Sequence, residues 1–349
     1  MRVLSIAGTG RNGATILGRT LGQVPGLVAV GELGYLWDRG LRIDQECGCG
    51  RPIRSCPFWT RVGEHAFGGW DAVNPERVVA LQGRVQRERF LPLLASRRLS
   101  RTVSPSFDAN LHAYASIMGR LYDGILGAAG ATIVVDAMKE LPYVYLQPRV
   151  PGIDLRILHL VRDSRGVAYS WSKHVKRGVS VGDPDVLRRT PARSARRWVG
   201  VNTMFEILAR SVPTMFMTYE SFVRSPRRAV AEILAFAGAD ARGGALEFIS
   251  PDGAVELDVT HTVEGSRTRF QSGAVPVRLD DEWRTRMPAR DRRLVTAITW
   301  PLLARYGYLD DDPPADRVDV PPSHVVRRPR RRARGVRPVP APVGFSKPS

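Results

Sequence analysis

Apolar residues recur in short continuous runs that are separated by longer amphipathic stretches. The runs lie at residues 3–7, 27–30, 132–136, 155–161 and 213–218. Runs of this kind are typical of strands buried on both faces of a parallel sheet. Because helical periodicity fills the stretches between them, we predict a three-layer α/β/α domain around a parallel sheet of about five strands.

Helical periodicity marks the segments that would cover this sheet. These segments are residues 75–99, 110–126, 189–208, 226–236 and 290–306. Packing against a core accounts for their apolar residues, so they predict helices but indicate no chemistry.

A glycine-rich loop follows the first predicted strand. Residues 8–15 read Gly-Thr-Gly-Arg-Asn-Gly-Ala-Thr, and helical periodicity resumes at Ile16. Glycines let the backbone turn sharply and approach a ligand, while the start of a helix offers free N–H groups and the positive end of its dipole. This arrangement favours a bound anion, most of all a phosphate group.

Three interpretations of the loop compete, besides a glycine turn that binds nothing. The Gly-x-Gly-x-x-Gly spacing fits a dinucleotide fingerprint, with Glu32 as the ribose-binding acid. The spacing also fits the loop of nucleoside triphosphatases, except that Ala14 replaces their phosphate-binding lysine. In the third interpretation Arg11 and the amides of residues 13–16 hold a phosphate without magnesium.

Charge and composition divide the chain into a folded part and a tail. The 349 residues carry a formal charge of +18, and residues 320–349 hold seven arginines, one lysine and no acid. We expect a folded domain at 1–312 and a disordered basic tail at 313–349. The tail would make at most weak contact with a membrane surface, and we expect no specific nucleic-acid partner. The short N-terminal apolar run does not fit a signal peptide, so we expect a cytoplasmic protein.

The three cysteines are crowded into one short segment. Residues 47–56 contain the pattern Cys-Gly-Cys-Gly-x5-Cys. An odd number of cysteines argues against a disulfide framework. Zinc could be bound with His65 as the fourth ligand, but the spacing matches no common zinc module. We therefore expect a loop of reduced thiols beside Phe58 and Trp59, and no metal.

A second informative stretch begins with the strand at 155–161. Arg162 ends this strand, Asp163 or Ser164 would cap the next helix, and Ser170 lies about two turns along it. Lys139, one of only four lysines, follows the strand at 132–136. Open α/β sheets bind ligands at the carboxyl ends of their strands, where these side chains would gather.

Together, the loop at 8–15 and the motif His-Leu-Val-Arg-Asp-x-Arg-x4-Ser at 159–170 resemble the two donor-binding elements of the sulfotransferase family. This family transfers sulfate from 3′-phosphoadenosine 5′-phosphosulfate (PAPS) and releases 3′,5′-ADP (PAP). The similarity extends over most of residues 1–309, and residues 31–33 and 47–59 look most like bacterial members. It implies a P-loop-like fold and a PAPS-dependent transferase that needs no metal.

The resemblance also implies roles for individual residues. Arg11 and the amides of residues 13–16 would hold the 5′-phosphosulfate, and Arg162 with Ser170 would hold the 3′-phosphate. Tyr219 would lie near the adenine, and Gly265 with Arg269, rather than Arg267, would close over the 3′-phosphate. The expected donor-binding residues are therefore Gly10, Arg11, Asn12, Gly13, Ala14, Thr15, Ile16, Arg162, Ser170, Tyr219, Gly265 and Arg269.

For catalysis we expect Glu32 to accept the proton of an acceptor hydroxyl, while Arg11 and Lys139 stabilise the departing phosphate. His65 and His112 are the next candidates for the base. A dinucleotide-dependent oxidoreductase is the alternative, but it gives no role to Lys139. The acceptor stays open among small molecules, lipids and glycans, because residues 58–130 and 173–200, which should shape its pocket, carry no recognisable motif.

The composition of the tail generates a first prediction. A chain that ends at Asp312 should unfold cooperatively and keep its affinity for 3′,5′-ADP, because the segment beyond it cannot bury a core. Thermal unfolding with and without the nucleotide would measure both properties. Loss of cooperative unfolding in the shortened chain would show that the tail packs on the domain.

Overall fold

The five apolar runs form one parallel sheet. The computed structural model describes residues 1–173, 189–239 and 244–309. The strands are β1 (Arg2–Ala7), β2 (Leu27–Gly31), β3 (Ile133–Asp136), β4 (Asp154–Val161) and β5 (Thr214–Thr218), in the order β2-β3-β1-β4-β5. Each strand boundary lies within one residue of its predicted position, so the predicted sheet is confirmed.

Side chains alternate between the two faces of the sheet and divide the core in two. In β1, Val3 and Ala7 belong to one core, whereas Leu4 and Ile6 belong to the other. All four side chains are buried, as expected of a parallel strand covered on both faces. The fold is therefore the three-layer α/β/α arrangement that the sequence predicts.

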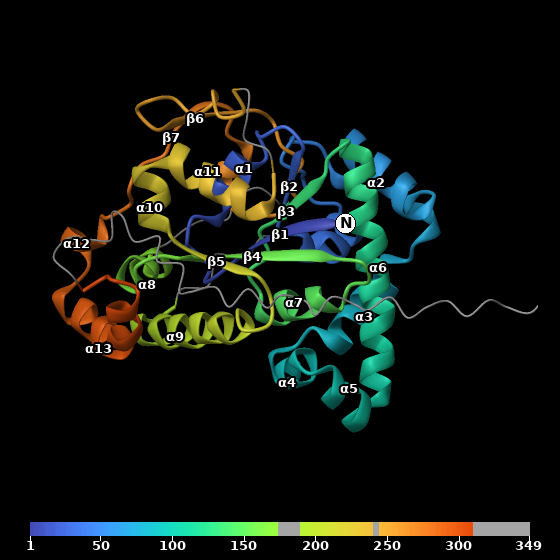
Figure 1. Cartoon of the computed structure of the whole chain (residues 1–349), viewed down its shortest axis with the longest axis horizontal. Coiled ribbons are helices and arrows are strands. Elements are labelled where there is room, and N and C mark those ends of the chain that lie inside the picture. Colours follow the sequence, from blue (N-terminus) through green and yellow to red (C-terminus); the bar gives the residue numbers. More distant parts are fainter. Residues whose placement is uncertain (174–188, 240–243, 310–349) are drawn as a thin grey trace, which may run out of the picture.

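One face of the sheet carries three helices and a small second sheet (Figure 1). The helices are α1 (Ala14–Leu21), α10 (Tyr219–Arg224) and α11 (Pro226–Ala237). Beside them, β6 (Ala254–Leu257) and β7 (Gly273–Pro276) pair in antiparallel fashion. This pair leaves no clear signal in the sequence, because four residues are too few for a clear period-two pattern.

The remaining helices cover the other face and its flank (Figure 1). On the face lie α2 (Pro57–Phe67), α3 (Pro75–Val85), α6 (Pro105–Ala129), α7 (Leu141–Leu146) and α9 (Pro191–Leu208). On the flank, α8 (Ser164–Ser172), α12 (Trp283–Arg286) and α13 (Ala289–Arg305) pack together and against α9. The long helix α6 begins with a proline in its first turn and ends at Gly130 in the left-handed conformation, with φ at 59°.

The helix predicted over residues 75–99 is interrupted, and its prediction as one segment is wrong. After α3 the chain forms η5 (Glu88–Phe90), α4 (Leu91–Ala95) and α5 (Arg97–Val103). Pro92 lacks the N–H that a continuing helix would donate. Ser96 then starts a new helix, because its side chain accepts a hydrogen bond from the Leu99 amide at 3.2 Å.

Short turns of 3₁₀ or π type complete the described chain. They are η1 (Leu33–Tyr35), η2 (Leu36–Arg42), η3 (Ile53–Ser55), η4 (Trp70–Ala72), η6 (Gln147–Arg149) and η7 (Arg267–Phe270). Among the described residues, no helix has both the length and the apolar character that crossing a membrane requires. The predicted tail at 313–349 and residues 174–188 of the expected acceptor segment lie outside the described residues.

Candidate functional site

The loop between β1 and α1 is shaped by left-handed backbone conformations. The φ angle is 138° at Gly8, 72° at Arg11 and 87° at Gly13. A Cβ atom on Gly8 would lie 2.2 Å from the carbonyl oxygen of Leu160, and one on Gly13 would lie 2.5 Å from the ring of Tyr219. Only glycine therefore fits at these two positions, and the loop lies directly against β4 and α10.

Asn12 anchors this loop from within. Its buried side chain donates a hydrogen bond through Nδ2 to the carbonyl oxygen of Leu160 at 2.8 Å, and its Oδ1 accepts one from the Ala14 amide at 3.2 Å. The first bond ties the loop to β4, and the second satisfies one free amide at the start of α1. The amides of Thr15 and Ile16 belong to the same first turn, where the helix dipole favours an anion.

Arg162 comes directly after β4 and contacts the same loop. Its Nη1 donates to the carbonyl oxygen of Arg11 at 3.2 Å, and its Nη2 lies 3.0 Å from Oδ2 of Asp280. The buried guanidinium group also stacks over Tyr219, with Cζ 4.8 Å from the ring centroid. The loop after β1, the end of β4 and the start of α10 thus meet at one point.

Two arginines lie over the ring of Trp171 on α8. Cζ of Arg11 lies 4.9 Å and Cζ of Arg189 lies 4.0 Å from the centroid of this ring, which also packs against Gly10. Burial lowers the pKa of Arg189, and neighbouring arginines, Arg11 among them, lower it further. Positive charge therefore accumulates here, beside the partly exposed Ser170.

Lys139 and Glu32 form an ion pair at the carboxyl ends of β3 and β2. Nζ of Lys139 lies 2.6 Å from Oε1 of Glu32 and also donates to the carbonyl oxygen of Ala137 at 2.9 Å. The two side chains are only 14% and 18% exposed. Because β2 and β3 are neighbours in the sheet and end at the same edge, they bring the predicted lysine and carboxylate together.

A buried carboxylate holds the turn that carries Lys139. Oδ2 of Asp136 accepts hydrogen bonds from Tyr143 at 2.6 Å and Tyr122 at 2.8 Å, and its Oδ1 accepts one from the Met138 amide at 3.0 Å. Burial raises the pKa of Asp136, while these donors oppose the increase. The network fixes the chain just before Lys139.

Residues 258–269 cross the beginning of α1 from the side of β2. The Ser266 amide donates to Oγ1 of Thr15 at 3.3 Å, and a Cβ atom on Gly265 would lie 3.1 Å from the same side chain. The Glu32 amide donates to the carbonyl oxygen of Glu264 at 3.4 Å. Gly265 therefore lies beside the start of α1, and its closure over the 3′-phosphate stays a prediction.

Arg269 contacts other residues than Arg162 does. It is buried, donates to the carbonyl oxygen of Glu46 at 3.3 Å and lies 3.7 Å from the carboxylate of Glu264. These partners belong to the β2 side of the edge, whereas Arg162 follows β4. Contact between Arg269 and the 3′-phosphate stays a prediction, and Arg267 is the more exposed of the two arginines.

A small cavity lies between α1 and the carboxyl ends of β2 and β3. Its lining includes Thr15, Glu32, Ala137 and Glu264. Thr15 in the first turn of α1 and Glu32 therefore line the same space. A second, larger cavity is lined by His112 and Asp154 at the opposite, amino edge of the sheet, and it contains none of the predicted donor-binding residues.

The two histidines named as further candidates for the base are remote from this edge. His112 lines the cavity at the amino edge, and His65 packs against Gly127 near the end of α6. Neither can accept a proton beside Lys139 at the carboxyl edge.

Four residues of the site had no signal in the sequence. Trp171, Arg189, Glu264 and Asp280 lie in loops or at ordinary helix positions and match no motif. Each acts through a contact with a residue distant in sequence, and such contacts become visible only once the chain is folded.

The order of the strands argues against the dinucleotide interpretation of the loop. A Rossmann sheet has the order 3-2-1-4-5-6, in which the acid after β2 lies next to the loop after β1. Here β3 lies between β1 and β2, and Glu32 pairs with Lys139 from β3. The carboxylate that the dinucleotide interpretation assigns to a ribose therefore lies one strand further from the glycine loop than in a Rossmann sheet.

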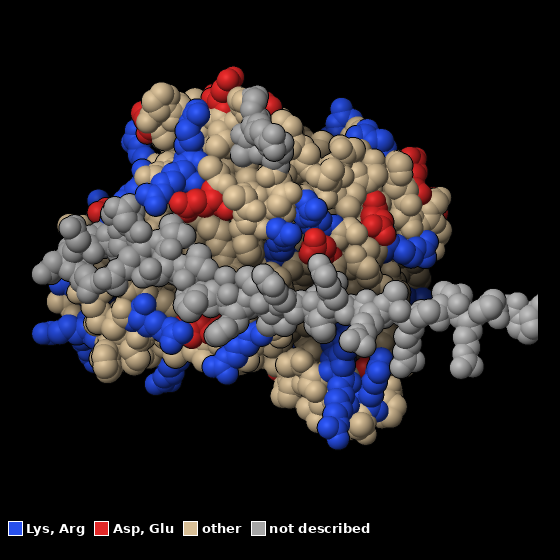
Figure 2. Space-filling model, viewed as in Figure 1, with Lys and Arg blue, Asp and Glu red and all other residues tan. Residues whose placement is uncertain are grey.

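Basic side chains on the surface do not form one continuous area in the view of Figure 2. They occupy several separate places on the described part of this face, and some lie beside acidic side chains. A surface that binds a duplex or a long single strand of nucleic acid would instead carry a continuous stripe of basic side chains.

A model of the sulfotransferase domain family matches residues 134–255. The matched segment includes Lys139, Arg162, Ser170 and Tyr219, and it confirms the resemblance that the sequence motifs imply. Sulfotransferases are transferases, so the match supports an enzyme of this class. The glycine loop and Glu32 precede the matched segment.

Two of the solved structures that are similar to the chain are sulfotransferase domains. The sulfotransferase domain of the olefin synthase of Synechococcus PCC 7002 is 19% identical, with a TM-score of 0.48 over 86% of this chain and 94% of that one. The sulfotransferase domain from the curacin biosynthetic pathway is 13% identical, with a TM-score of 0.40 over 84% of this chain and 95% of that one. No curated protein sequence matches the chain.

The pairing of Arg162 with Asp280 generates a second prediction. The Asp280 carboxylate competes with any anion that approaches this guanidinium group, so Asp280→Asn should tighten the binding of 3′,5′-ADP about fivefold, or by ~1 kcal/mol. Isothermal titration would measure the change, with Asp281→Asn as the matched control on the exposed neighbour. Weaker binding in Asp280→Asn would mean that the carboxylate serves to position Arg162.

Proposed function

We propose that this protein transfers the sulfuryl group of PAPS to a hydroxyl group of an acceptor. One observation carries the proposal above all: Arg162 after β4 donates a hydrogen bond to the backbone of Arg11 in the loop after β1. Two anion-binding elements are thereby fixed side by side at the edge of the sheet where α/β folds bind ligands. PAPS has two phosphate-bearing ends, and the paired elements suit such a donor.

Each end of the donor has a chemically suitable partner. Arg11 and the first turn of α1 would hold the 5′-phosphosulfate, since backbone amides, the helix dipole and a guanidinium group all favour an anion. Arg162 and Ser170 would hold the 3′-phosphate. Tyr219 would border the adenine, because its ring already lies against Gly13 and under the Arg162 guanidinium group.

The reaction needs a positive charge at the departing oxygen and a proton acceptor at the incoming one. In an in-line transfer the acceptor oxygen bonds to sulfur while the bond between sulfur and the phosphate oxygen breaks. Lys139 and Arg11 would stabilise the departing phosphate, and Glu32 would take the proton of the acceptor hydroxyl. The ion pair of Glu32 and Lys139 holds the two groups ready at adjacent positions.

Binding of the donor should not depend on magnesium. Nucleoside triphosphatases use a lysine at the position of Ala14 and a magnesium ion at the following hydroxyl. The side chain of Ala14 cannot bind a phosphate as that lysine does, and in this loop Arg11 would provide the cation instead.

A small-molecule, lipid or glycan hydroxyl is proposed as the acceptor.

The proposed donor generates a third prediction. 3′,5′-ADP should stabilise the full chain against heat without magnesium, by ~2.7 kcal/mol at a hundred times its dissociation constant. Arg162→Ala should remove most of the preference for 3′,5′-ADP over 5′-AMP, whereas Arg77→Ala on the exposed side of α3 should leave it unchanged. A larger stabilisation by NAD, or one that requires magnesium, would contradict the proposal.

The position of Glu32 generates a fourth prediction. Glu32→Gln keeps the shape of the side chain and removes its basicity, so sulfate transfer should fall by ~10²–10⁴ while affinity for 3′,5′-ADP stays within a few-fold. Transfer from radiolabelled PAPS to a panel of phenols, sugars and hydroxylated lipids would measure this change. Glu76→Gln on α3 is the control for a change of carboxylate at a distance from the site.

The same variant separates two roles of Glu32. Full turnover in Glu32→Gln would place the base elsewhere at this edge. Collapse of nucleotide affinity would make Glu32 a ligand of the donor, as the dinucleotide interpretation requires.

A further inference from the structure

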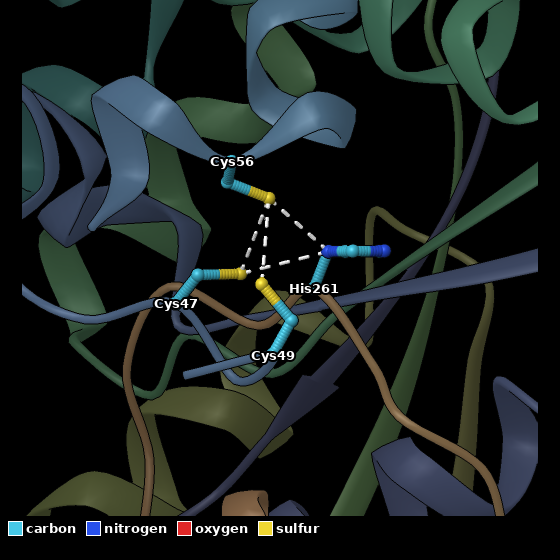
Figure 3. A group of neighbouring side chains, drawn as sticks. All are labelled: Cys47, Cys49, Cys56 and His261. Carbon is cyan, nitrogen blue, oxygen red and sulfur yellow. Dashed lines mark hydrogen bonds between the residues drawn. The ribbon is translucent and has the colours of Figure 1, made fainter. Parts of the chain in front are cut away.

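Three cysteines and a histidine converge at a place that the proposed reaction does not use (Figure 3). Cys47, Cys49 and Cys56 come from one loop, and His261 joins them from a segment more than 200 residues later. Their sulfur atoms and one ring nitrogen all lie within 4.8 Å of one another. The fold thus gathers every cysteine of the chain around one point.

Four of the six distances between these atoms are close to those in a tetrahedron around a metal ion. Sγ of Cys56 lies 3.7 Å from Sγ of Cys47, 3.7 Å from Sγ of Cys49 and 3.2 Å from Nδ1 of His261. Sγ of Cys47 lies 3.7 Å from the same nitrogen. Zinc with Zn–S distances of about 2.3 Å and Zn–N distances of about 2.0 Å would place tetrahedral ligands about 3.5–3.8 Å apart.

The cysteine loop is built to present its sulfur atoms on one side. The Cys47 amide donates to the carbonyl oxygen of Arg51 at 2.7 Å, and the Gly50 amide donates to the carbonyl oxygen of Cys47 at 2.8 Å. The second bond closes a tight turn, which Gly50 completes with φ at 80°. Cys56 comes just before α2, where the helix dipole favours a thiolate.

His261 is oriented toward the sulfur atoms by two aromatic residues. Phe58 stacks on its ring at 4.9 Å between centroids, and Nε1 of Trp59 donates to its carbonyl oxygen at 3.1 Å. Nδ1 faces the thiols, as Figure 3 shows. Cys47 and Cys56 are fully buried, whereas Cys49 and His261 are partly exposed, so an ion at the centre would be shielded from water on the side of Cys47 and Cys56.

We propose that Cys47, Cys49, Cys56 and His261 bind one structural zinc ion. Three thiolates and an imidazole are a ligand set that zinc prefers, and four protein ligands leave no open position for substrate. Binding releases the thiol protons, because thiolates rather than thiols coordinate the metal. This proposal departs from the expectation of a metal-free loop, and it takes His261 as the fourth ligand instead of His65, which packs against Gly127 on α6.

The ion would join the cysteine loop to the segment that covers the donor edge. Three residues after His261, the carbonyl oxygen of Glu264 accepts the Glu32 amide, and the Val263 amide donates to Val30 in β2. The Gly48 amide donates to the carbonyl oxygen of Thr262 at 2.9 Å. Zinc would therefore fix the path of residues 261–266 without taking part in sulfate transfer.

The fifth prediction is that the full chain, purified without chelator, contains about one equivalent of zinc per chain by elemental analysis. Cobalt added to chelator-treated protein should give the absorption of a tetrahedral site with thiolate ligands. His261→Asn should weaken zinc binding by more than about 100-fold, since loss of a group that merely supports a ligand costs about 10–100-fold. His65→Asn is the matched control and should keep full metal content.

The outcomes are distinct even if the cysteine variants fail to fold. Chelator-treated protein should unfold at a lower temperature, and zinc should restore the original value. Wild-type protein that binds neither zinc nor cobalt while its thiols react freely would overturn the proposal. So would a disulfide among the three cysteines, or unchanged zinc affinity in His261→Asn. None of these measurements uses PAPS, so failure here leaves the proposed transferase activity a separate question.

Discussion

The candidate site depends on contacts between the loop after β1 and the end of β4. Asn12 reaches the carbonyl oxygen of Leu160, and Arg162 reaches back to the carbonyl oxygen of Arg11, so each element satisfies a backbone group of the other. Parallel neighbours end at the same edge of a sheet, which makes this exchange geometrically possible. Because Gly8 packs too closely against Leu160 for any Cβ atom, the loop has little freedom to take another path.

The cations at this edge are held in advance by the protein's own carboxylates. Lys139 pairs with Glu32, Arg162 with Asp280, and Glu264 with Arg39 at 2.5 Å. Apart from the Asp280 carboxylate, which is 44% exposed, these charges are largely buried and expensive to leave unpaired, so the pairs keep the edge ordered before any ligand binds. An incoming phosphate must compete with a carboxylate for its arginine. The binding free energy then reflects how much better the arginine pairs with the phosphate than with the carboxylate, rather than the full energy of pairing two opposite charges.

The sheet was predictable because a parallel strand buried on both faces leaves a local signal in the sequence. Arg11 and Arg162, which touch each other, and Lys139 were predictable at the same edge of the sheet, since each follows such a strand. The boundaries within 75–99 and the pairing of β6 with β7 were not, because periodicity does not reveal where a proline or a cap interrupts it. His261 and Asp280 were unpredictable for a different reason: their partners lie far away in the sequence.

The late segment shows how an irregular chain can be held in place at a functional edge. Between β6 and η7 it forms no strand, so backbone and side-chain groups from elsewhere in the chain must satisfy its backbone. Arg19, buried in α1, donates to the carbonyl oxygens of Asp258 and Thr268 and to the hydroxyl of Thr260. These bonds hold the two ends of the segment to the helix that begins at the glycine loop. The proposed zinc ion at His261 would fix its middle, so the cover over the donor edge would be anchored at three points.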